Sequence, residues 1–317
     1  MLVELGRAKE GLTTAERALE EAERAGPQAT NARLRALDAR GLALNFLGDF
    51  SATIQAMDAV VTLADQVGEL LMATRSRVNL GFALTRVGCI EAGERSIERA
   101  LEDARMLRMP AGEGFALHNL GRIRARQRRL DEAIELQQQA AAIGERMGHQ
   151  RLTLLARIYE AMFLAWRRQS DDVQRAVLLV ELARADSLSY PFAEIEATLA
   201  QAQVDRARND KEAALQRCTE ALERLSSLGS MEEGEEGLHL TRLWVLLDLG
   251  RDEEADAAAR DAYDCVRARC ARLGSKTHRE AYLSNIYECR KIIDVAADRL
   301  SLTRPLVSVY PPSIRSE

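Results

Sequence analysis

The sequence is poor in the features that mark a compact enzyme or a membrane protein. Aromatic residues make up 4% of the 317 residues, and there are only six prolines. No stretch approaches the roughly 18 consecutive apolar residues that a membrane-spanning helix requires. The first residues, MLVELGRAKEGLTTAE, lack the basic start and apolar core of a signal peptide. Because Ala, Leu, Arg and Glu dominate instead, the composition favours helix, and we expect a cytoplasmic protein that does not enter a membrane.

An excess of charge of one sign is also missing. The chain has 44 basic and 49 acidic residues, interspersed along most of its length, with a formal net charge of −5 and an isoelectric point near 5.7. A nucleic-acid binder usually shows a basic excess. We therefore expect no nucleic-acid partner.

Cysteine is sparse and scattered. The five cysteines are odd in number and lie mostly on helical stretches, which suits free thiols in a reducing compartment rather than a disulfide framework. The one grouping that suggests a metal consists of Cys265, Cys270, His278 and Cys289. Its spacing matches none of the compact zinc patterns, so we predict no metal and no cofactor.

Catalytic motifs are absent as well. The sequence contains no GxxxxGK[ST] loop, no GxGxxG after a strand, no HExxH and no GxSxG. The four histidines lie in different units or at turns, and their spacing suggests no nucleophilic partner. We predict no catalytic residues and no enzymatic activity.

What the sequence does contain is a period of 40 residues. The glycines Gly41, Gly81 and Gly121 recur at this interval, and each opens a similar string such as GFALTRVGCIEAGERSIERAL. The frame continues with larger residues at Ala161 and Gln201, and a sixth unit, LWVLLDLGRDEEADAAARDAY, follows two residues late. A chain of this length forms either two domains or an elongated array. The period favours an array of helix–turn–helix units.

The glycines have a mechanical explanation. Twelve residues beyond them stand Thr53, Gly93 and Ala133, the small residues expected on the facing helix of each unit. An interior glycine costs a helix about 1 kcal/mol relative to alanine. Its recurrence in phase therefore predicts close approach of the two helices in each unit.

Two strings, VNLGFALTRVGCIEAGERSIERALEDARML and HNLGRIRARQRRLDEAIELQQQAAAIGERMG, resemble tetratricopeptide repeats, with the Leu-Gly pair, the turn and the small residue of the second helix. The resemblance implies an all-α fold, a right-handed α-solenoid of helix–turn–helix repeats. A 40-residue unit is similar to the extended variety found in kinesin light chains and in large bacterial signalling regulators.

This frame divides the chain into four parts. Residues 1–29 are expected to be a partial N-terminal repeat, residues 30–273 about six repeats, residues 274–301 a C-terminal capping helix, and residues 302–317 an extended tail. The capping helix is expected to run from Thr277, a capping-type residue, to about Leu300. Its string HREAYLSNIYECRKIIDVAADRL is similar to the terminal helix of the repeat arms of bacterial multidomain kinases and ATP-dependent transcription activators.

A binding face follows from the frame, because the first helices of stacked pairs line the concave wall of a superhelix. Positions six, three and two before the small residue, and one, four and five after it, are expected to be exposed there. The candidate peptide-binding residues are Arg75, Asn79, Arg86, His118, Asn119, Arg122, Arg126, Tyr159, Met162 and Trp166.

These residue types suit an extended peptide. An asparagine amide donates to a carbonyl and accepts from an N–H, so Asn79 and Asn119 are predicted to read peptide backbone, as inner asparagines do in the 40-residue relatives. The arginines are suited to acidic groups, and the aromatics of the fourth unit to an apolar side chain. The alternatives are that the asparagines bond within the solenoid, that arginines pair with Glu94, Glu98 or Asp131, and that the aromatics belong to the core.

The leading hypothesis is a scaffold or adaptor that holds a protein or an extended, acidic peptide in its concave channel. A second hypothesis makes the chain the sensory arm of a bacterial multidomain kinase or ATP-dependent transcription regulator. A third is a self-assembling scaffold that associates through its end helices or its C-terminal tail.

Overall fold

The computed structural model describes residues 7–187, 190–228 and 234–301, and these residues form an all-α structure without strands. The predicted 302–317 tail lies outside the described residues. The helices are α1 (Ala8–Ala25), α2 (Thr30–Phe46), α3 (Phe50–Val67), α4 (Leu70–Arg86), α5 (Ile90–Met106), α6 (Pro110–Arg126), α7 (Leu130–Met147), α8 (Gln150–Arg167), α9 (Asp172–Ser187), α10 (Pro191–Ala207), α11 (Lys211–Leu228), α12 (Glu235–Asp248), α13 (Asp252–Arg272), α14 (Lys276–Asn285) and α15 (Tyr287–Leu300), with a 3₁₀ turn η1 (Pro27–Ala29) between the first two.

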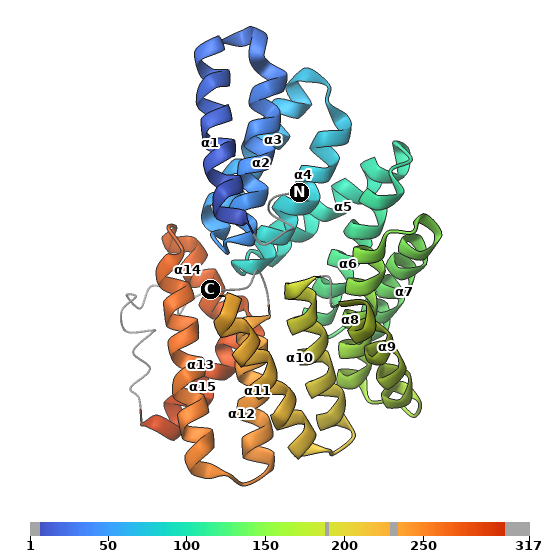
Figure 1. Cartoon of the computed structure of the whole chain (residues 1–317), viewed down its shortest axis with the longest axis vertical. Helices are drawn as coiled ribbons and strands as arrows, with labels where there is room; N and C mark the ends of the chain where they lie inside the picture. Colours follow the sequence, from blue (N-terminus) through green and yellow to red (C-terminus); the bar gives the residue numbers. More distant parts are fainter. Residues whose placement is uncertain (1–6, 188–189, 229–233, 302–317) are drawn as a thin grey trace.

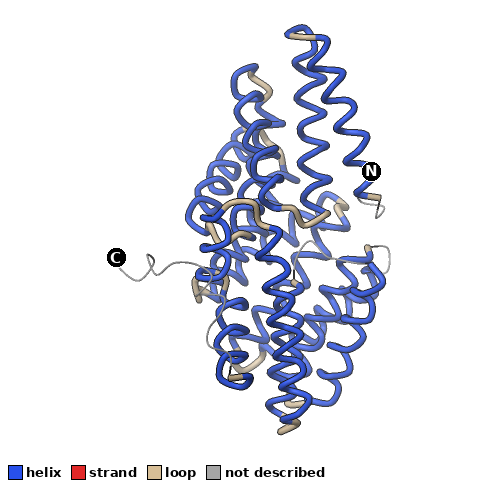
Figure 2. The backbone as a smooth tube through the Cα atoms, turned by 90° about the vertical axis from the view of Figure 1, so that its left-hand side faces the viewer, coloured by secondary structure: helices blue, strands red, loops and turns tan. Residues whose placement is uncertain are grey.

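Consecutive helices pack against each other along the chain, which is the arrangement of a solenoid. The pairs α2–α3, α4–α5, α6–α7, α8–α9, α10–α11 and α12–α13 correspond to six successive units, and α1 packs on α2. Figure 1 shows the pairs curving round, and Figure 2 shows short loops between them. Among the described residues, no helix combines the length and apolar composition that crossing a membrane requires.

Many of the turns between helices share one backbone device. A residue one or two places after the helix adopts a left-handed conformation, as at Gly48 (φ 73°) and Gly88 (φ 83°). The next N–H then bonds back to a carbonyl of the last turn, for example Cys89 N to Leu84 O at 2.9 Å, which satisfies carbonyls that the helix end would otherwise leave unpaired. Sharp reversals of this kind keep the helices of a pair antiparallel.

The predicted close approach inside the units is confirmed. A Cβ built on Gly81 would lie 2.8 Å from the carbonyl oxygen of Gly93, and one on Gly121 would lie 3.1 Å from that of Ala133. In the first unit the tightest neighbour of Gly41 is the Met57 methyl, 2.6 Å from such a Cβ. The glycines therefore set the spacing between helices.

The predicted single helix from Thr277 to Leu300 is wrong. Ser275, and not Thr277, caps the first of two helices, since its Oγ accepts the N–H of His278. Ile286 is extended (φ −82°, ψ 117°) and separates α14 from α15. The sequence has no proline or glycine there to signal a break. The physical reason is burial, because the break lets Ile286 and Tyr282 enter the same apolar core.

That core closes the superhelix. It joins Phe50 and Phe82 from the first two units to residues of α13, α14 and α15. The turn at Gly88 lies so close to α14 that a Cβ there would be 2.2 Å from Ala281 O. Asn285 Nδ2 also donates to Gly88 O at 2.9 Å. In Figure 1 the C-terminal helices accordingly return to the turn that joins α4 and α5.

The close packing yields a first prediction. Gly81→Ala should destabilise the fold by about 1–3 kcal/mol, because the new methyl group would meet Ile97 at 2.3 Å and the Gly93 carbonyl. Denaturant unfolding followed by circular dichroism measures the change. Gly112→Ala is the matched control. Its Cβ would meet only ordinary contacts at 3.5 Å or more, so it should gain up to about 1 kcal/mol from helix propensity.

Candidate functional site

Closure of the superhelix turns its inner wall into two cavities. The large cavity, about 860 Å³, is lined mainly by α2, α4, α6, α8 and α10. The small cavity, about 490 Å³, lies between α6, α8, α10, α12 and α15. Three side chains, Arg122, Tyr159 and Glu196, line both cavities. These residues form a partition between the two spaces.

The partition is held together by ring and charge contacts. The Arg122 guanidinium lies 5.0 Å from the Phe82 ring centroid and 4.9 Å from that of Tyr159. Its Nη1 donates to Asn119 Oδ1 at 3.0 Å, and Tyr159 OH donates to Glu196 at 3.4 Å. Stacking of this kind contributes about 0.5–2 kcal/mol per contact. Arg122 is therefore fixed in the wall and is not a mobile side chain.

The expectation that the inner positions are exposed is wrong for most of them. Six of the candidate residues are buried: Arg86, His118, Asn119, Arg122, Tyr159 and Met162. Of the others, Asn79 and Arg126 are half-buried and Arg75 and Trp166 are exposed. The reason is the closure, which brings the inner faces of opposite units toward each other.

The two candidate asparagines, Asn79 and Asn119, differ in their hydrogen bonds. Asn119 Nδ2 donates to Phe115 O at 3.0 Å and its Oδ1 accepts from Arg122, so both ends of this amide are used within α6. Asn79 lines the large cavity and forms no hydrogen bond with any described residue. Only the Asn79 amide is therefore available to a ligand without breaking an existing bond.

The candidate arginines also have different surroundings. Arg75 pairs with Asp38 at 2.6 Å at the edge of the large cavity. Arg126 lines the small cavity, where its Nη1 donates to Thr85 O at 3.0 Å. Arg86 is buried, with 3% of its side chain exposed, and pairs with Glu236 at 3.0 Å. Arg86 and Arg126 thus both line the small cavity, whereas Arg75 lines the large one.

Glu236 is the centre of a buried cluster of charges. Its carboxylate contacts Arg86 and Arg269 at 3.0 and 3.2 Å and accepts a 2.6 Å hydrogen bond from Tyr282 OH. Burial alone would raise the pKa of Glu236, but the two guanidiniums and the hydroxyl hold it well below its usual range. These partners come from α4, α13 and α14. Glu236 therefore connects the second unit to the end of the chain.

His118 is a structural residue of the wall. Its Nδ1 lies 2.8 Å from Gln137 Oε1, and Gln137 Nε2 donates to the His118 carbonyl at 2.9 Å. The amide oxygen can only accept, so Nδ1 carries the proton. Burial lowers the pKa of His118 to about 3, and the charge of Arg122 acts in the same direction.

The aromatic and thioether candidates lie in the small cavity. Met162 and Trp166 both line it, and Trp166 Nε1 donates to Gln203 Oε1 at 2.9 Å. The Phe163 ring packs against Trp166 at 5.4 Å. The Trp166 ring is thus held in a fixed orientation at the cavity wall.

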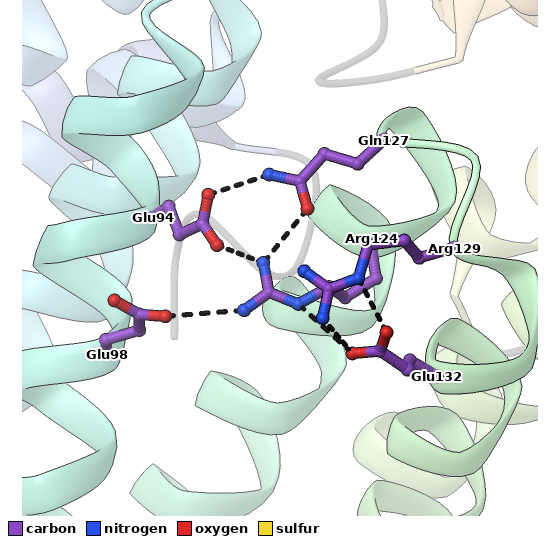
Figure 3. A network of polar contacts seen from close by, with 6 residues as sticks. All are labelled: Glu94, Glu98, Arg124, Gln127, Arg129 and Glu132. Atoms are coloured by element: carbon purple, nitrogen blue, oxygen red, sulfur yellow. Dashed lines mark hydrogen bonds and ion pairs between the residues drawn. The ribbon is translucent and has the colours of Figure 1, made fainter.

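Carboxylates that lie away from the cavities pair with Arg124, which is not one of the candidate residues. Arg124 pairs with Glu94, Glu98 and Glu132, and Gln127 and Arg129 complete the network shown in Figure 3. This network ties the second unit to the third. None of its arginines is a candidate site residue, so Glu94 and Glu98 do not neutralise the inner wall.

Several cavity residues were missed by the sequence reasoning. They are Arg128, Arg151, Arg168, Phe192, Glu196, Trp244, Tyr287 and Glu288. Arg151 and Phe192 are the second residues of α8 and α10, outside the six positions counted from the small residue of each unit. Tyr287 and Glu288 belong to α15. The 40-residue period carries no signal for them, since they meet the inner wall only through closure.

A family model described as tetratricopeptide repeat matches residues 71–146, which span α4 to α7. The chain therefore contains tetratricopeptide repeats. Tetratricopeptide repeats form scaffolds that hold protein partners, so this part of the chain is a protein-interaction scaffold. No curated protein sequence matches the chain.

Several solved structures align with about 70% of this chain. BtubC (BKLC) from P. vanneervenii is 16% identical with a TM-score of 0.53, over 70% of this chain and 92% of that one. TPR-like repeats of a candidate kinesin light chain from Podosopora anserina align at a TM-score of 0.40 with 17% identity, over 71% of this chain and 95% of that one. A variant of the same repeats is 16% identical with a TM-score of 0.42, over 70% and 96%. At 16% identity the likeness to BtubC concerns the fold alone.

The buried cluster yields a second prediction. Glu236→Gln should destabilise the repeat array by about 3–5 kcal/mol, because the buried Arg86 and Arg269 guanidiniums lose the charge of the carboxylate that they share, although Arg269 keeps its pair with Glu235. Glu132→Gln, in the outer network of Figure 3, should cost less than about 1 kcal/mol. Thermal unfolding of both variants at neutral pH measures the difference. Equal losses would contradict the central role of Glu236.

A third prediction concerns pH. The folded-state pKa of His118 is lowered to about 3, whereas an unfolded histidine titrates near pH 6.5. The unfolded state therefore takes up a proton first, and stability that is present above about pH 6.5 is lost as the pH falls. The loss from this residue reaches about 2 kcal/mol at pH 5. Urea unfolding at pH 7 and pH 5 should show a smaller pH dependence for His118→Gln than for the natural protein.

Proposed function

We propose that this tetratricopeptide repeat protein is a non-catalytic scaffold that holds an extended peptide segment of a partner in the large cavity. The observation that carries the proposal is the Asn79 amide, which faces this cavity and bonds to no described residue. A peptide backbone offers a donor and an acceptor to such an amide at once. The five free cysteines suit a reducing compartment, such as the cytoplasm.

Apolar pockets beside Asn79 support the same occupant. Phe82 and Phe115 line the large cavity from α4 and α6, and Phe46 packs on Phe192 across it at 6.3 Å between ring centroids. A preformed wall of rigid aromatic side chains leaves the ordering cost mainly with the ligand. Peptide side chains would therefore bind between these rings while the backbone meets Asn79.

The charge of the large cavity favours an acidic peptide. Arg151 lies over the Phe46 ring at 5.6 Å and pairs with no carboxylate of the described residues. Arg122 and Arg75 also line the cavity, although Arg75 is paired with Asp38. A carboxylate on the peptide would gain charge-assisted hydrogen bonds from Arg151.

A fourth prediction tests this site. Peptides selected from a random library on the immobilised protein should be enriched in Asp and Glu, and Asn79→Ala should weaken them about tenfold through loss of two backbone hydrogen bonds. Arg151→Ala should abolish the preference for acidic residues. Fluorescence anisotropy of labelled peptides gives the affinities.

Matched controls come from outside the cavity. Asn31 and Arg95 are exposed on α2 and α5, and their alanine variants should bind the selected peptides normally. Peptides that bind Asn79→Ala as tightly as the natural protein would place the binding face elsewhere.

A further inference from the structure

The small cavity carries an excess of positive charge that the peptide site does not explain. Six arginines line it: Arg86, Arg122, Arg126, Arg128, Arg168 and Arg206. Among the described residues, only three carboxylates line it, those of Glu196, Glu236 and Glu288. In a partly enclosed space such an imbalance attracts anions, because low-dielectric walls focus the field.

The internal ion pairs do not remove this excess. Arg206 is neutralised by Asp248 at 2.7 Å, and Arg86 by Glu236. In contrast, Arg126, Arg128 and Arg168 form no ion pair with a carboxylate of the described residues.

The hydrogen bonds of these three arginines leave donors unused. Arg126 donates from one nitrogen to Thr85 O, and Arg168 donates to Ala165 O at 3.3 Å. Arg128 lies over the Tyr287 ring at 4.6 Å. Each guanidinium has five N–H donors, so most of their donors remain available.

Arg126 is the arginine of these three whose charged form is disfavoured by its surroundings. Burial lowers its pKa to about 10 despite the attraction of Glu288. Repulsion from Arg86 and Arg122 acts in the same direction as burial. An anion placed beside Arg126 would relieve both effects.

Glu288 is the carboxylate that could compete with such an anion, because Glu236 is paired with Arg86 and Arg269 and Glu196 accepts from Tyr159 OH. Its Oε2 is buried and has no hydrogen-bond partner among the described residues. A single glutamate supplies one negative charge against three arginines without an ion pair, so the excess stays positive even when Glu288 is ionised.

Flat apolar surfaces stand beside the arginines. Trp166, Trp244 and Tyr287 line the same cavity, and the Trp244 and Tyr287 rings lie 6.3 Å apart. The Trp166 ring is oriented by its bond to Gln203. Aromatic walls next to convergent cationic groups are typical of small-molecule sites, and a volume of about 490 Å³ lies in their usual range.

We propose that the small cavity binds a small organic anion, whose carboxylate or phosphate group contacts Arg126 and whose planar apolar part lies against Trp166 and Trp244. This site is separate from the peptide site in the large cavity, although both share the partition. It exists only in the closed superhelix, since Tyr287 and Glu288 of α15 form part of its wall.

The chain offers a direct reporter for this site. It contains two tryptophans, and both line the small cavity. Titration with phenyl phosphate should therefore give a saturable change in intrinsic tryptophan fluorescence. Benzoate, tested in parallel, distinguishes phosphate from carboxylate as the preferred acid group, and saturation with either supports the proposal. Phenol and inorganic phosphate each lack one half of the ligand and should bind at least about tenfold more weakly.

Variants locate the binding. Arg126→Gln should weaken binding of the phenyl anion about tenfold or more, as loss of a charge-assisted contact does. Arg105→Gln is the matched control, because Arg105 lies outside both cavities and pairs with Glu113. Arg128→Gln combined with Arg168→Gln changes only exposed positions, so this double variant keeps the test available if Arg126→Gln does not fold.

The result that would overturn the proposal is the absence of saturable binding for both phenyl phosphate and benzoate. Unchanged affinity in both arginine variants would overturn it equally. A loss of affinity in Asn79→Ala but not in Arg126→Gln would assign the anion to the large cavity and also refute it. Failure of peptide selection on the large cavity leaves these outcomes unaffected.

Discussion

The closed form of the molecule depends on one carboxylate. Glu236 lies on α12, near the end of the array, yet its partners come from the second unit, from α13 and from α14. Arg86 and Arg269 are both buried, with 3% of each side chain exposed, so neither charge has an alternative partner in water. Without Glu236 the closure would bury both guanidiniums without the carboxylate that they share, which makes removal of Glu236 costly, although Arg269 would keep its pair with Glu235 at 2.8 Å.

Both cavities follow from this closure. The inner wall of an open array would be a continuous exposed groove. Here the α2 end meets the start of α10 through Phe46 and Phe192, and α15 covers the far side of the small cavity. The shared partition of Arg122, Tyr159 and Glu196 means that a ligand in either space touches side chains of the other. The inner surface is thus divided into a larger space beside Asn79 and a smaller one beside Arg126.

The sequence could predict what depends on neighbouring units. The phase set by Gly81 and Gly121 is visible because each packs on a helix only about a dozen residues away, and the identity of the repeats follows from the same local pattern. Arg86 and Glu236 are 150 residues apart, and no periodic signal connects them. Asn79 and Asn119 occupy equivalent positions in the repeat, yet only Asn119 has an arginine one turn later, Arg122, that uses its oxygen. The break at Ile286 was hidden for the same reason, since only the distant core explains it.

The contact between α14 and the turn at Gly88 also determines how many repeats the chain can have. Repeat arrays usually tolerate the gain or loss of a unit, because each unit touches only its neighbours. In this molecule an additional helix pair anywhere between α5 and α12 would carry Ala281 away from Gly88 and Glu236 away from Arg86. The number of units is therefore constrained, as in a ring, and not open, as in a rod. Natural variation in length should be found at α1 and outside the helices from α4 to α14.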